Sequence, residues 1–236
     1  MIKACIFDLD GTLLDTLTSL WYCSSESLRK EGLCVLPREN YRHYVGDGAR
    51  TRVERYLRDT ERDSNADPAV LHPGALLHDP HDPGDFPYYF DSYMRELDLH
   101  ADYEVHPYEG IPELLDRLKA AGIRLAVFSN KPDPATVRVI RGAFGGELFD
   151  MVLGKREELP KKPDPAGVFM ILKQLGVKPE ETLYIGDTDT DMKTGKNAGL
   201  FTLGAAWGFR GRKELEESGA DAVIGRPEEM LRYAGI

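Results

Sequence analysis

The sequence has few cysteines, no long apolar run and no excess of positive charge. Its three cysteines, Cys5, Cys23 and Cys34, have no spacing typical of a metal or redox site. No uninterrupted apolar stretch is long enough to cross a bilayer. The net charge of −10 argues against nucleic acid and anionic membranes as main partners.

These absences favour an ordinary globular protein of a reducing compartment. The 236 residues suffice for one large domain or for a core with a small insert. The first apolar run begins at residue 2, and we expect no targeting segment before it. Cys5 lies in that run and is expected to be a small buried residue. The expected location is the cytoplasm.

The apolar pattern of residues 16–105 is helical. Apolar side chains recur at helical spacing in 17–31, 49–57 and 86–97. Between the last two lies the segment 60–85, which is rich in Asp, Pro and His and has little periodicity. Such a composition predicts a long loop or a mobile segment.

The remainder of the chain alternates strands with helices. The predicted strands cover 2–7, 123–128, 151–153, 183–185, 201–203 and 222–224. The predicted helices cover 111–121, 134–144 and 165–175. This alternation predicts an α/β fold with a doubly wound parallel sheet.

Two aspartates follow the first strand directly, in the sequence IFDLDGTLLDT at residues 6–16. Asp8 and Asp10 share a face in extended geometry, at the strand end where α/β proteins build sites. Two adjacent carboxylates repel each other unless a cation is bound or one of them is protonated. Both conditions fit a carboxylate nucleophile with a neighbouring acid. The alternative is a simple turn or capping pair.

This stretch resembles the first motif of the haloacid dehalogenase superfamily in its phosphatase form. The resemblance implies that Asp8 is the nucleophile and Asp10 the general acid/base. Asp10 also argues against the dehalogenase branch, which lacks the second aspartate. The turn residues Gly11 and Thr12 are then candidates for substrate binding, and glycine permits a backbone conformation that other residues avoid.

The resemblance also implies a domain organisation. Residues 1–15 and 106–236 would form the catalytic core, a Rossmann-like parallel sheet. Residues 16–105 would form a smaller all-helical cap, inserted just after the first motif.

Two further segments resemble the second and third motifs of the same family. Ser129 ends a predicted strand, and the resemblance implies that its hydroxyl donates to a phosphate oxygen. Asn130 and Lys131 are weaker candidates for substrate binding, and the alternative interpretation of Lys131 is a solvated surface charge. Lys162, rather than Lys161, precedes a proline as the family's lysine does. That lysine would contact both the nucleophile and the phosphate.

The sequence GDTDTD at residues 186–191 matches the fourth motif. The resemblance implies a metal site formed by Asp8, Asp10, Asp187 and Asp191. Clustered carboxylates suit Mg²⁺, a hard cation that prefers oxygen ligands. The alternatives are an Asx-type turn and a calcium loop, although EF-hand spacing is absent.

In the helical part, the sequence VGDGAR at residues 45–50 resembles a substrate-facing loop of phosphoglycolate-phosphatase-like members. Arg50 could hold a second anionic group of the substrate. The competing interpretation is a solvated helix arginine. His72, His78 and His81 lack the pattern of a metal site, and we interpret them as part of a polar loop.

The predicted function is hydrolysis of a small phosphomonoester through an aspartyl-phosphate, and phosphoglycolate is the best single substrate candidate. Rival functions are a sugar-phosphate mutase, a pyrophosphatase of the same fold and a non-catalytic binding protein. The expected cofactor is Mg²⁺. The expected partner is the small-molecule phosphoester, with no nucleic acid and no membrane, in a monomer or homodimer.

Overall fold

The computed structural model describes residues 1–236, which divide into two compact units. The α/β unit contains Met1–Thr16 and Val105–Ile236, and the helical unit contains Leu17–Glu104. None of the helices combines the length and the apolar character that crossing a membrane would require.

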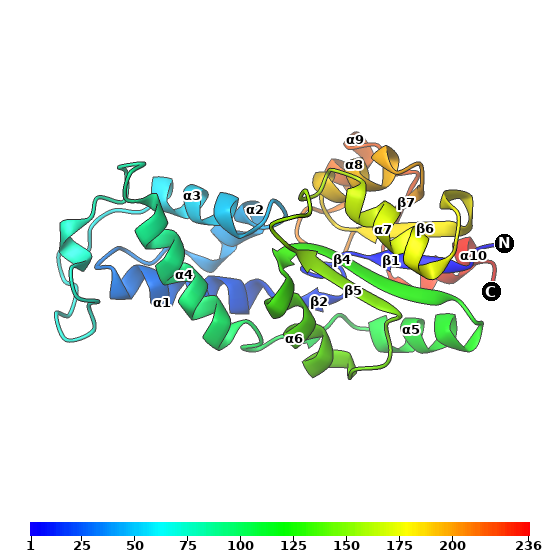
Figure 1. Ribbon diagram of the computed structural model, residues 1–236, viewed down its shortest axis with the longest axis horizontal. Helices are drawn as coiled ribbons and strands as arrows, with labels where there is room; N and C mark the ends of the chain where they lie inside the picture. Colours follow the sequence, from blue (N-terminus) through cyan, green and yellow to red (C-terminus); the bar gives the residue numbers. More distant parts are fainter. The chain divides into compact units, whose positions relative to one another are not determined.

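A six-stranded sheet forms the centre of the α/β unit (Figure 1). Its strand order is β5-β4-β1-β6-β7-β8, and every neighbouring pair is parallel. The strands are β1 (Ala4–Phe7), β4 (Arg124–Pro132), β5 (Met151–Lys155), β6 (Thr182–Gly186), β7 (Phe201–Ala205) and β8 (Ala222–Ile224). From the central β1 the chain builds outward in both directions, which confirms the predicted doubly wound α/β fold.

Helices cover both faces of this sheet (Figure 1). They are α5 (Ile111–Ala120), α6 (Asp133–Phe144), α7 (Ala166–Leu175), α8 (Asp189–Asn197), α9 (Arg212–Glu217) and α10 (Leu231–Ala234), with short 3₁₀ turns at Pro179–Glu181 and Pro227–Met230. Right-handed crossovers place α5 and α6 on one face, because they serve strands added in one direction. The helices α7, α8 and α9 serve the opposite direction and cover the other face.

One apolar layer shows why these segments become strands and helices. Ile6, Phe128 and Tyr184, from three neighbouring strands, are buried together with Val168 and Ile171 of α7. Strand side chains alternate between the two faces, and helical side chains three apart share one face. The apolar spacing in each segment therefore matches the surface that it covers.

A small antiparallel pair joins the two ends of the inserted segment. β2 (Leu14–Asp15) pairs with β3 (His106–Pro107), with Leu14 opposite Pro107. The sequence did not predict these two-residue strands, which are too short to have a periodic pattern.

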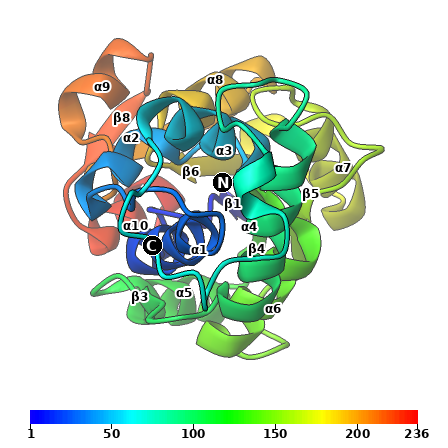
Figure 2. The same ribbon diagram turned by 90° about the vertical axis from the view of Figure 1, so that its left-hand side faces the viewer.

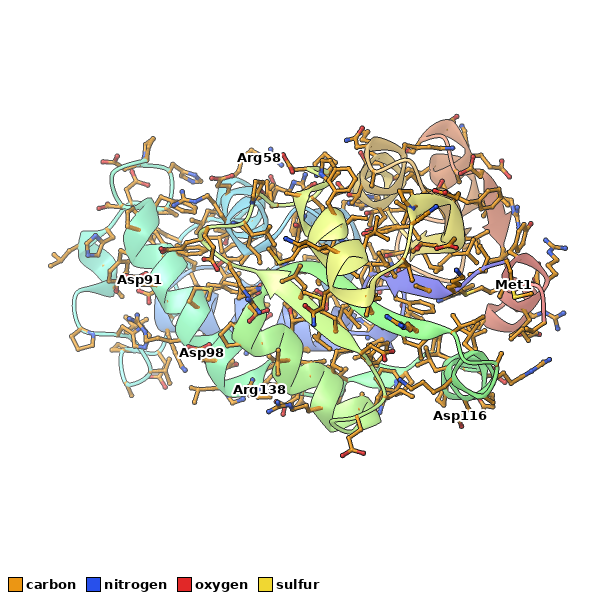
Figure 3. The ribbon with its side chains drawn as sticks, turned by 45° about the vertical axis from the view of Figure 1, so that its right-hand side comes forward. Met1, Arg58, Asp91, Asp98, Asp116 and Arg138 are labelled. Carbon is orange, nitrogen blue, oxygen red and sulfur yellow. The ribbon has the colours of Figure 1, made fainter.

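The helical unit consists of α1 (Leu17–Lys30), α2 (Tyr41–Tyr44), α3 (Ala49–Asp59) and α4 (Phe86–His100), with 3₁₀ turns at Arg38–Asn40 and Ala75–Leu77. The helices α1 and α4 pack side by side (Figure 2). Tyr41, Tyr56 and Tyr93 are among its largest fully buried side chains. Charged residues such as Arg58 on α3 and Asp98 on α4 are exposed, as is Asp116 on α5 of the other unit (Figure 3).

The segment 60–85 is a loop, as predicted, and it is attached to the helices by specific hydrogen bonds. Arg62 donates to the carbonyl of Glu31 at 2.9 Å and also to the carbonyl of His78. The Nδ1 atom of His72 lies 2.7 Å from the Glu31 carboxylate, and that of His78 lies 3.0 Å from the Asp85 carboxylate. His72 thus ties the loop to the residue that follows α1, whereas His78 contacts a carboxylate of the loop itself.

Candidate active site

The carboxyl ends of three adjacent strands bring together residues from distant parts of the sequence. Asp8 directly follows β1, Ser129 lies near the end of β4, and Asp187 directly follows β6. The amide of Asp8 donates to the carbonyl of Ile185 at 2.8 Å, so the sheet itself fixes its position. Parallel strands end at the same edge of a sheet, and this edge is where α/β folds form ligand sites.

The turn after Asp8 packs closely against Asp187 of the fourth motif. Gly11 has a φ of +92°, in the left-handed region that glycine tolerates. A side chain there would overlap the carboxylate of Asp187 and the ring of Phe209. The next residue, Thr12, donates its hydroxyl to Oδ1 of Asp187 at 3.1 Å. Gly11 and Thr12 thus position Asp187 beside the Asp8 strand.

Asp8 forms a buried ion pair with Lys162. Oδ1 of Asp8 lies 2.6 Å from Nζ of Lys162, and both side chains are buried. Burial and the negative charge of Asp191 raise the pKa of Asp8 to about 7, although Lys162 acts in the opposite direction. Burial alone would lower the pKa of Lys162, but Asp191 and Asp8 outweigh it and hold that pKa well above its ordinary value. Lys162 is therefore a permanent positive charge beside the predicted nucleophile.

Asn130 holds the backbone of Lys162. Its Oδ1 accepts from the Lys162 amide at 2.8 Å, and its Nδ2 donates to the Lys162 carbonyl at 3.2 Å. This pair of bonds joins the segment of the second motif to the segment of the third. Asn130 thereby fixes where the lysine side chain begins.

Asp187 is a fully buried carboxylate in a group that it shares with Asp8 and Asp191. One ligand oxygen from each of the three lies within 4.8 Å of the others. The Phe209 amide donates to Oδ2 of Asp187 at 2.8 Å. Burial, followed by the charges of Asp191 and Asp8, raises the pKa of Asp187 well above its usual range. The group therefore favours a bound cation or a retained proton.

Asp191 has partners within the protein for both of its oxygens. Its Oδ1 accepts from Nζ of Lys162 at 2.7 Å and from the hydroxyl of Tyr184 at 3.3 Å. Its Oδ2 accepts from the amide and the hydroxyl of Thr188, in a capping box that begins α8. Asp191 thus orients Lys162 and starts a helix, and it has less capacity for a metal than Asp8 or Asp187.

Asp10 lies apart from the group formed by Asp8, Asp187 and Asp191. Its Oδ1 lies 3.0 Å from Nζ of Lys131, which is fully buried. The alternative interpretation of Lys131 as a solvated surface charge is therefore wrong. β4 continues beyond the predicted strand to Pro132, with an irregular register after Phe128, and so carries Lys131 inward.

Ser129 lies beside this pair. Its Oγ accepts a hydrogen bond from the amide of Lys131 at 3.2 Å. An Oγ that accepts through its lone pair keeps its own proton available for an acceptor at the strand ends. This geometry is compatible with the donor role predicted for Ser129.

Arg50 makes its contacts within the helical unit. Its guanidinium lies 4.6 Å from the ring centre of Phe86 and 5.6 Å from that of Phe90. It also lies 3.9 Å from Glu54, in the exposed i,i+4 pair of a helix. These contacts involve none of the other predicted site residues, and a cation over two aromatic rings is a packing arrangement in its own right.

Three further residues complete the site, and for none of them did the sequence indicate the contact that it makes. Lys131 pairs with Asp10, the Phe209 amide binds Asp187, and the Trp207 indole donates to the carbonyl of Thr12 at 3.0 Å. Trp207 and Phe209 lie about twenty residues beyond the fourth motif, in a turn after β7, where no local pattern indicates their role.

The available ligands suit a hard divalent cation. The α/β unit buries four carboxylates but only two lysine ammonium groups. A divalent cation would offset the two remaining negative charges, and oxygen ligands are those that Mg²⁺ prefers. Asp8 and Asp187 are the best-placed ligands, because Asp191 is occupied by Lys162 and Thr188, and Asp10 is paired with Lys131.

Comparison with known proteins gives consistent matches over nearly the whole chain. The haloacid dehalogenase-like hydrolase family matches residues 5–205. A phosphoglycolate phosphatase of Aquifex aeolicus is 29% identical over 98% of this chain and 96% of its own. A solved structure from Lactobacillus delbrueckii has a TM-score of 0.84 and 27% identity, with 98% of both chains covered.

A further solved structure includes a bound ligand. CbbY of Rhodobacter sphaeroides, in a mutant form in complex with xylulose-(1,5)bisphosphate, has a TM-score of 0.73 and 29% identity. The match covers 98% of this chain and 96% of that one.

Proposed function

The chain belongs to the haloacid dehalogenase-like hydrolase family, and from that premise we propose that it is a Mg²⁺-dependent phosphatase whose best substrate candidate is phosphoglycolate. It is an enzyme that hydrolyses phosphate esters. The observation that carries the proposal is the buried pair of Asp8 and Lys162, 2.6 Å apart, beside the carboxylate of Asp187. The relative from Aquifex aeolicus supports the choice of substrate.

In the proposed first step, a carboxylate oxygen of Asp8 attacks phosphorus and forms an aspartyl-phosphate. Lys162 holds that carboxylate in place and contributes positive charge toward the transferring phosphoryl group. The oxygen of the leaving group takes a proton from the carboxyl group of Asp10. When bound by Asp8 and Asp187, Mg²⁺ would supply the charge that neutralises the phosphoryl oxygens.

In the proposed second step, a water molecule hydrolyses the aspartyl-phosphate. Asp10, now a carboxylate, takes a proton from the water as its oxygen attacks phosphorus. The bond between phosphorus and Asp8 breaks, inorganic phosphate is formed, and both aspartates return to their starting states.

The residues around the two aspartates would complete the substrate site. We assign the hydroxyl of Ser129 to a phosphate oxygen, and the turn of Gly11 and Thr12 to the same group. Asn130 would act by holding the backbone of Lys162 rather than by contacting the substrate directly. Asp191 would orient the same lysine.

The two units would divide the work of catalysis. Residues 1–15 and 106–236 form the proposed catalytic core, and residues 16–105 the proposed cap that selects the leaving group. A cytoplasmic location, and a monomer or homodimer without a nucleic-acid or membrane partner, remain predictions. The three free cysteines are compatible with a reducing compartment.

A second substrate class has support from one relative. CbbY of Rhodobacter sphaeroides was solved with xylulose-(1,5)bisphosphate, so a sugar bisphosphate is the alternative candidate for this chain. Its chemistry would use the same nucleophile and acid.

A phosphate-release assay over a panel of substrates tests the proposal. The panel contains phosphoglycolate, pentose bisphosphates, hexose monophosphates and pyrophosphate, each with and without Mg²⁺. We expect the highest kcat/KM for phosphoglycolate, and no release after chelation. Preference for pyrophosphate, or interconversion of glucose phosphates without phosphate release, would replace the proposal with one of its rivals. If the metal-loaded protein turned over no ester, the assignment of phosphatase activity itself would be contradicted.

A further inference from the structure

The α/β unit buries two lysines, and they serve different carboxylates. Lys162 contacts Asp8 and Asp191, whereas Lys131 contacts Asp10. Asp8 and Asp10 therefore have different ammonium partners. The proposed function gives Lys162 a role toward phosphate, but it leaves Lys131 without one.

The position of Lys131 is fixed along its backbone as well as at its tip. Its amide donates to Oγ of Ser129 at 3.2 Å, and its carbonyl accepts from Oγ1 of Thr136 at 3.1 Å. Its side chain is fully buried and ends 3.0 Å from Oδ1 of Asp10. The ammonium is thus aimed at one particular carboxylate oxygen.

Stability alone is a weak explanation for a buried ion pair such as that of Lys131 and Asp10. Removing two charges from water is costly, and apolar side chains of similar volume often stabilise a fold at least as well. A fixed charge beside a reacting group, in contrast, orients that group before the reaction begins.

We propose that Lys131 is a positioning residue that holds the carboxyl group of Asp10 in the orientation required for proton transfer to the leaving group. The inference rests on the proposed function, in which Asp10 is the acid and base. With Oδ1 directed toward Lys131, the proton to be transferred is carried by Oδ2.

The first step transfers one phosphoryl group to Asp8 and one proton from Asp10. Asp8 forms a bond to phosphorus, the bond from phosphorus to the leaving oxygen breaks, and that oxygen keeps the bonding electrons. The proton on Oδ2 of Asp10 passes to the leaving oxygen and gives a neutral alcohol. The carboxylate that remains on Asp10 is paired with the ammonium of Lys131 until water returns a proton to it.

The value of this orientation depends on the leaving group. An alkoxide is strongly basic and needs a proton as it departs, whereas p-nitrophenolate is a weak base and departs without one. A residue that serves only to orient the acid therefore matters for alkyl phosphates and matters little for p-nitrophenyl phosphate. A residue that serves only the fold would affect both substrates alike.

The test is Lys131→Met, with kcat/KM measured for p-nitrophenyl phosphate, phenyl phosphate and any alkyl phosphate that the wild type hydrolyses. We expect a loss of about 10²-fold for the alkyl phosphate and of less than about fivefold for p-nitrophenyl phosphate. Lys173→Met, at an exposed lysine of α7, is the matched control and should change neither value. Because any alkyl ester can be used, the test does not depend on phosphoglycolate being the substrate.

A double-mutant cycle separates action through Asp10 from direct contact with substrate. In an Asp10→Asn background, Lys131→Met should cause no further loss for the alkyl phosphate, and this double variant has no unpaired buried charge. Lys131→Arg, which keeps the positive charge, should retain most of the activity that Lys131→Met loses. If Lys131→Met does not fold, Lys131→Gln replaces it, with the same dependence on the leaving group.

Equal losses for all leaving groups, or an additional loss in the Asp10→Asn background, would overturn the inference and assign Lys131 to substrate binding or to the fold. A wild type that hydrolyses no ester would instead contradict the proposed function, which is a separate result.

Discussion

Both units bury charged side chains, but they balance these charges differently. In the helical unit, the buried Glu31 accepts from the Ser92 hydroxyl at 2.6 Å and lies 2.7 Å from Nδ1 of His72. The buried Glu96 lies 2.5 Å from Nζ of Lys30. Each carboxylate has a basic partner from another segment, and the pairs join α1, α4 and the loop.

In the α/β unit, the carboxylates outnumber their partners. Lys162 is shared between Asp8 and Asp191, and Asp187 has hydroxyl and amide donors rather than a cation. Buried charge with local partners holds segments together, whereas buried charge in excess of its partners indicates where a ligand completes the balance. The excess of buried carboxylates therefore marks the site independently of any sequence motif.

The largest expected effect is that of Asp8→Asn. This variant removes the proposed nucleophile and one of the excess charges, so we expect a loss of kcat on the order of 10⁴-fold or more. The melting temperature of the metal-free protein should stay the same or rise, because the amide relieves repulsion with Asp191. Phosphate release and thermal unfolding measure the two quantities. Turnover near the wild-type rate would remove Asp8 from the mechanism.

Removing one lysine from each unit should separate structural from functional charge. Lys162→Met leaves two buried carboxylates without their cation, and we expect a loss of about 3 kcal/mol in the free energy of unfolding and of about 10²-fold or more in kcat. Lys30→Met breaks a partly exposed pair, and it should cost about 1 kcal/mol with kcat unchanged. Urea unfolding and phosphate release measure both variants. An equal loss of activity in the two would end the distinction between structural and functional charge.

Mg²⁺ affinity should depend on pH through the excess carboxylates. Burial and the Asp191 charge raise the pKa of Asp8 to about 7, so protons compete with the cation. We expect Mg²⁺ to bind about tenfold more weakly at pH 6 than at pH 8, measured by titration calorimetry. In the Asp8→Asn variant this dependence should be flatter.

The stability of the metal-free protein should change with pH in the corresponding direction. A carboxyl group whose pKa is raised by folding holds a proton that the unfolded chain releases, so its contribution is lost as the pH rises toward 7. Mg²⁺ should therefore raise the melting temperature more at pH 8 than at pH 6. An equal rise at both values would contradict the shifted pKa of Asp8.

The smallest expected effect is that of Arg50→Ala. Its guanidinium packs over Phe86 and Phe90, and we expect a loss of about 1 kcal/mol in stability with little change in kcat/KM. A substrate contact would give a different result: a loss of more than about tenfold for phosphoglycolate and none for an aryl phosphate. Kinetics on both substrates, with Arg58→Ala as a matched exposed arginine, distinguish the two roles.

The six strands of the parallel sheet could be predicted because each contains a short apolar run bounded by turn residues, and the central strands β1 and β6 are buried on both faces. The helix α8 (Asp189–Asn197) was missed, because Met192 is its only large apolar residue. It forms because Thr188 and Asp191 cap its start and its small residues pack on β6 and β7. Local periodicity does not report such a helix, since tertiary contacts decide it.

The residues of the candidate site also divide into those that a local pattern reveals and those that only tertiary contacts place. Asp8, Lys162 and Asp187 could be predicted, because each lies at a strand end or before a helix within a recognisable spacing. The inward path of Lys131 depends on the irregular end of β4, and the role of the Phe209 amide depends on a turn that folds back onto Asp187. Both are properties of the assembled sheet rather than of any local segment.

The pair of β2 and β3 has a consequence for the order of folding during synthesis. The helical unit is continuous in sequence, but the α/β unit is not, because Ala4 of β1 pairs with Arg124 of β4. A nascent chain can complete the helical unit before β4 has been made. Before Leu14 and Pro107 pair, the chain between β1 and β4 includes the whole insertion. Once they are paired, the loop that must close to bring β1 to β4 contains little more than α5 and its turns. The insertion thus changes a distant strand pairing into a nearly local one.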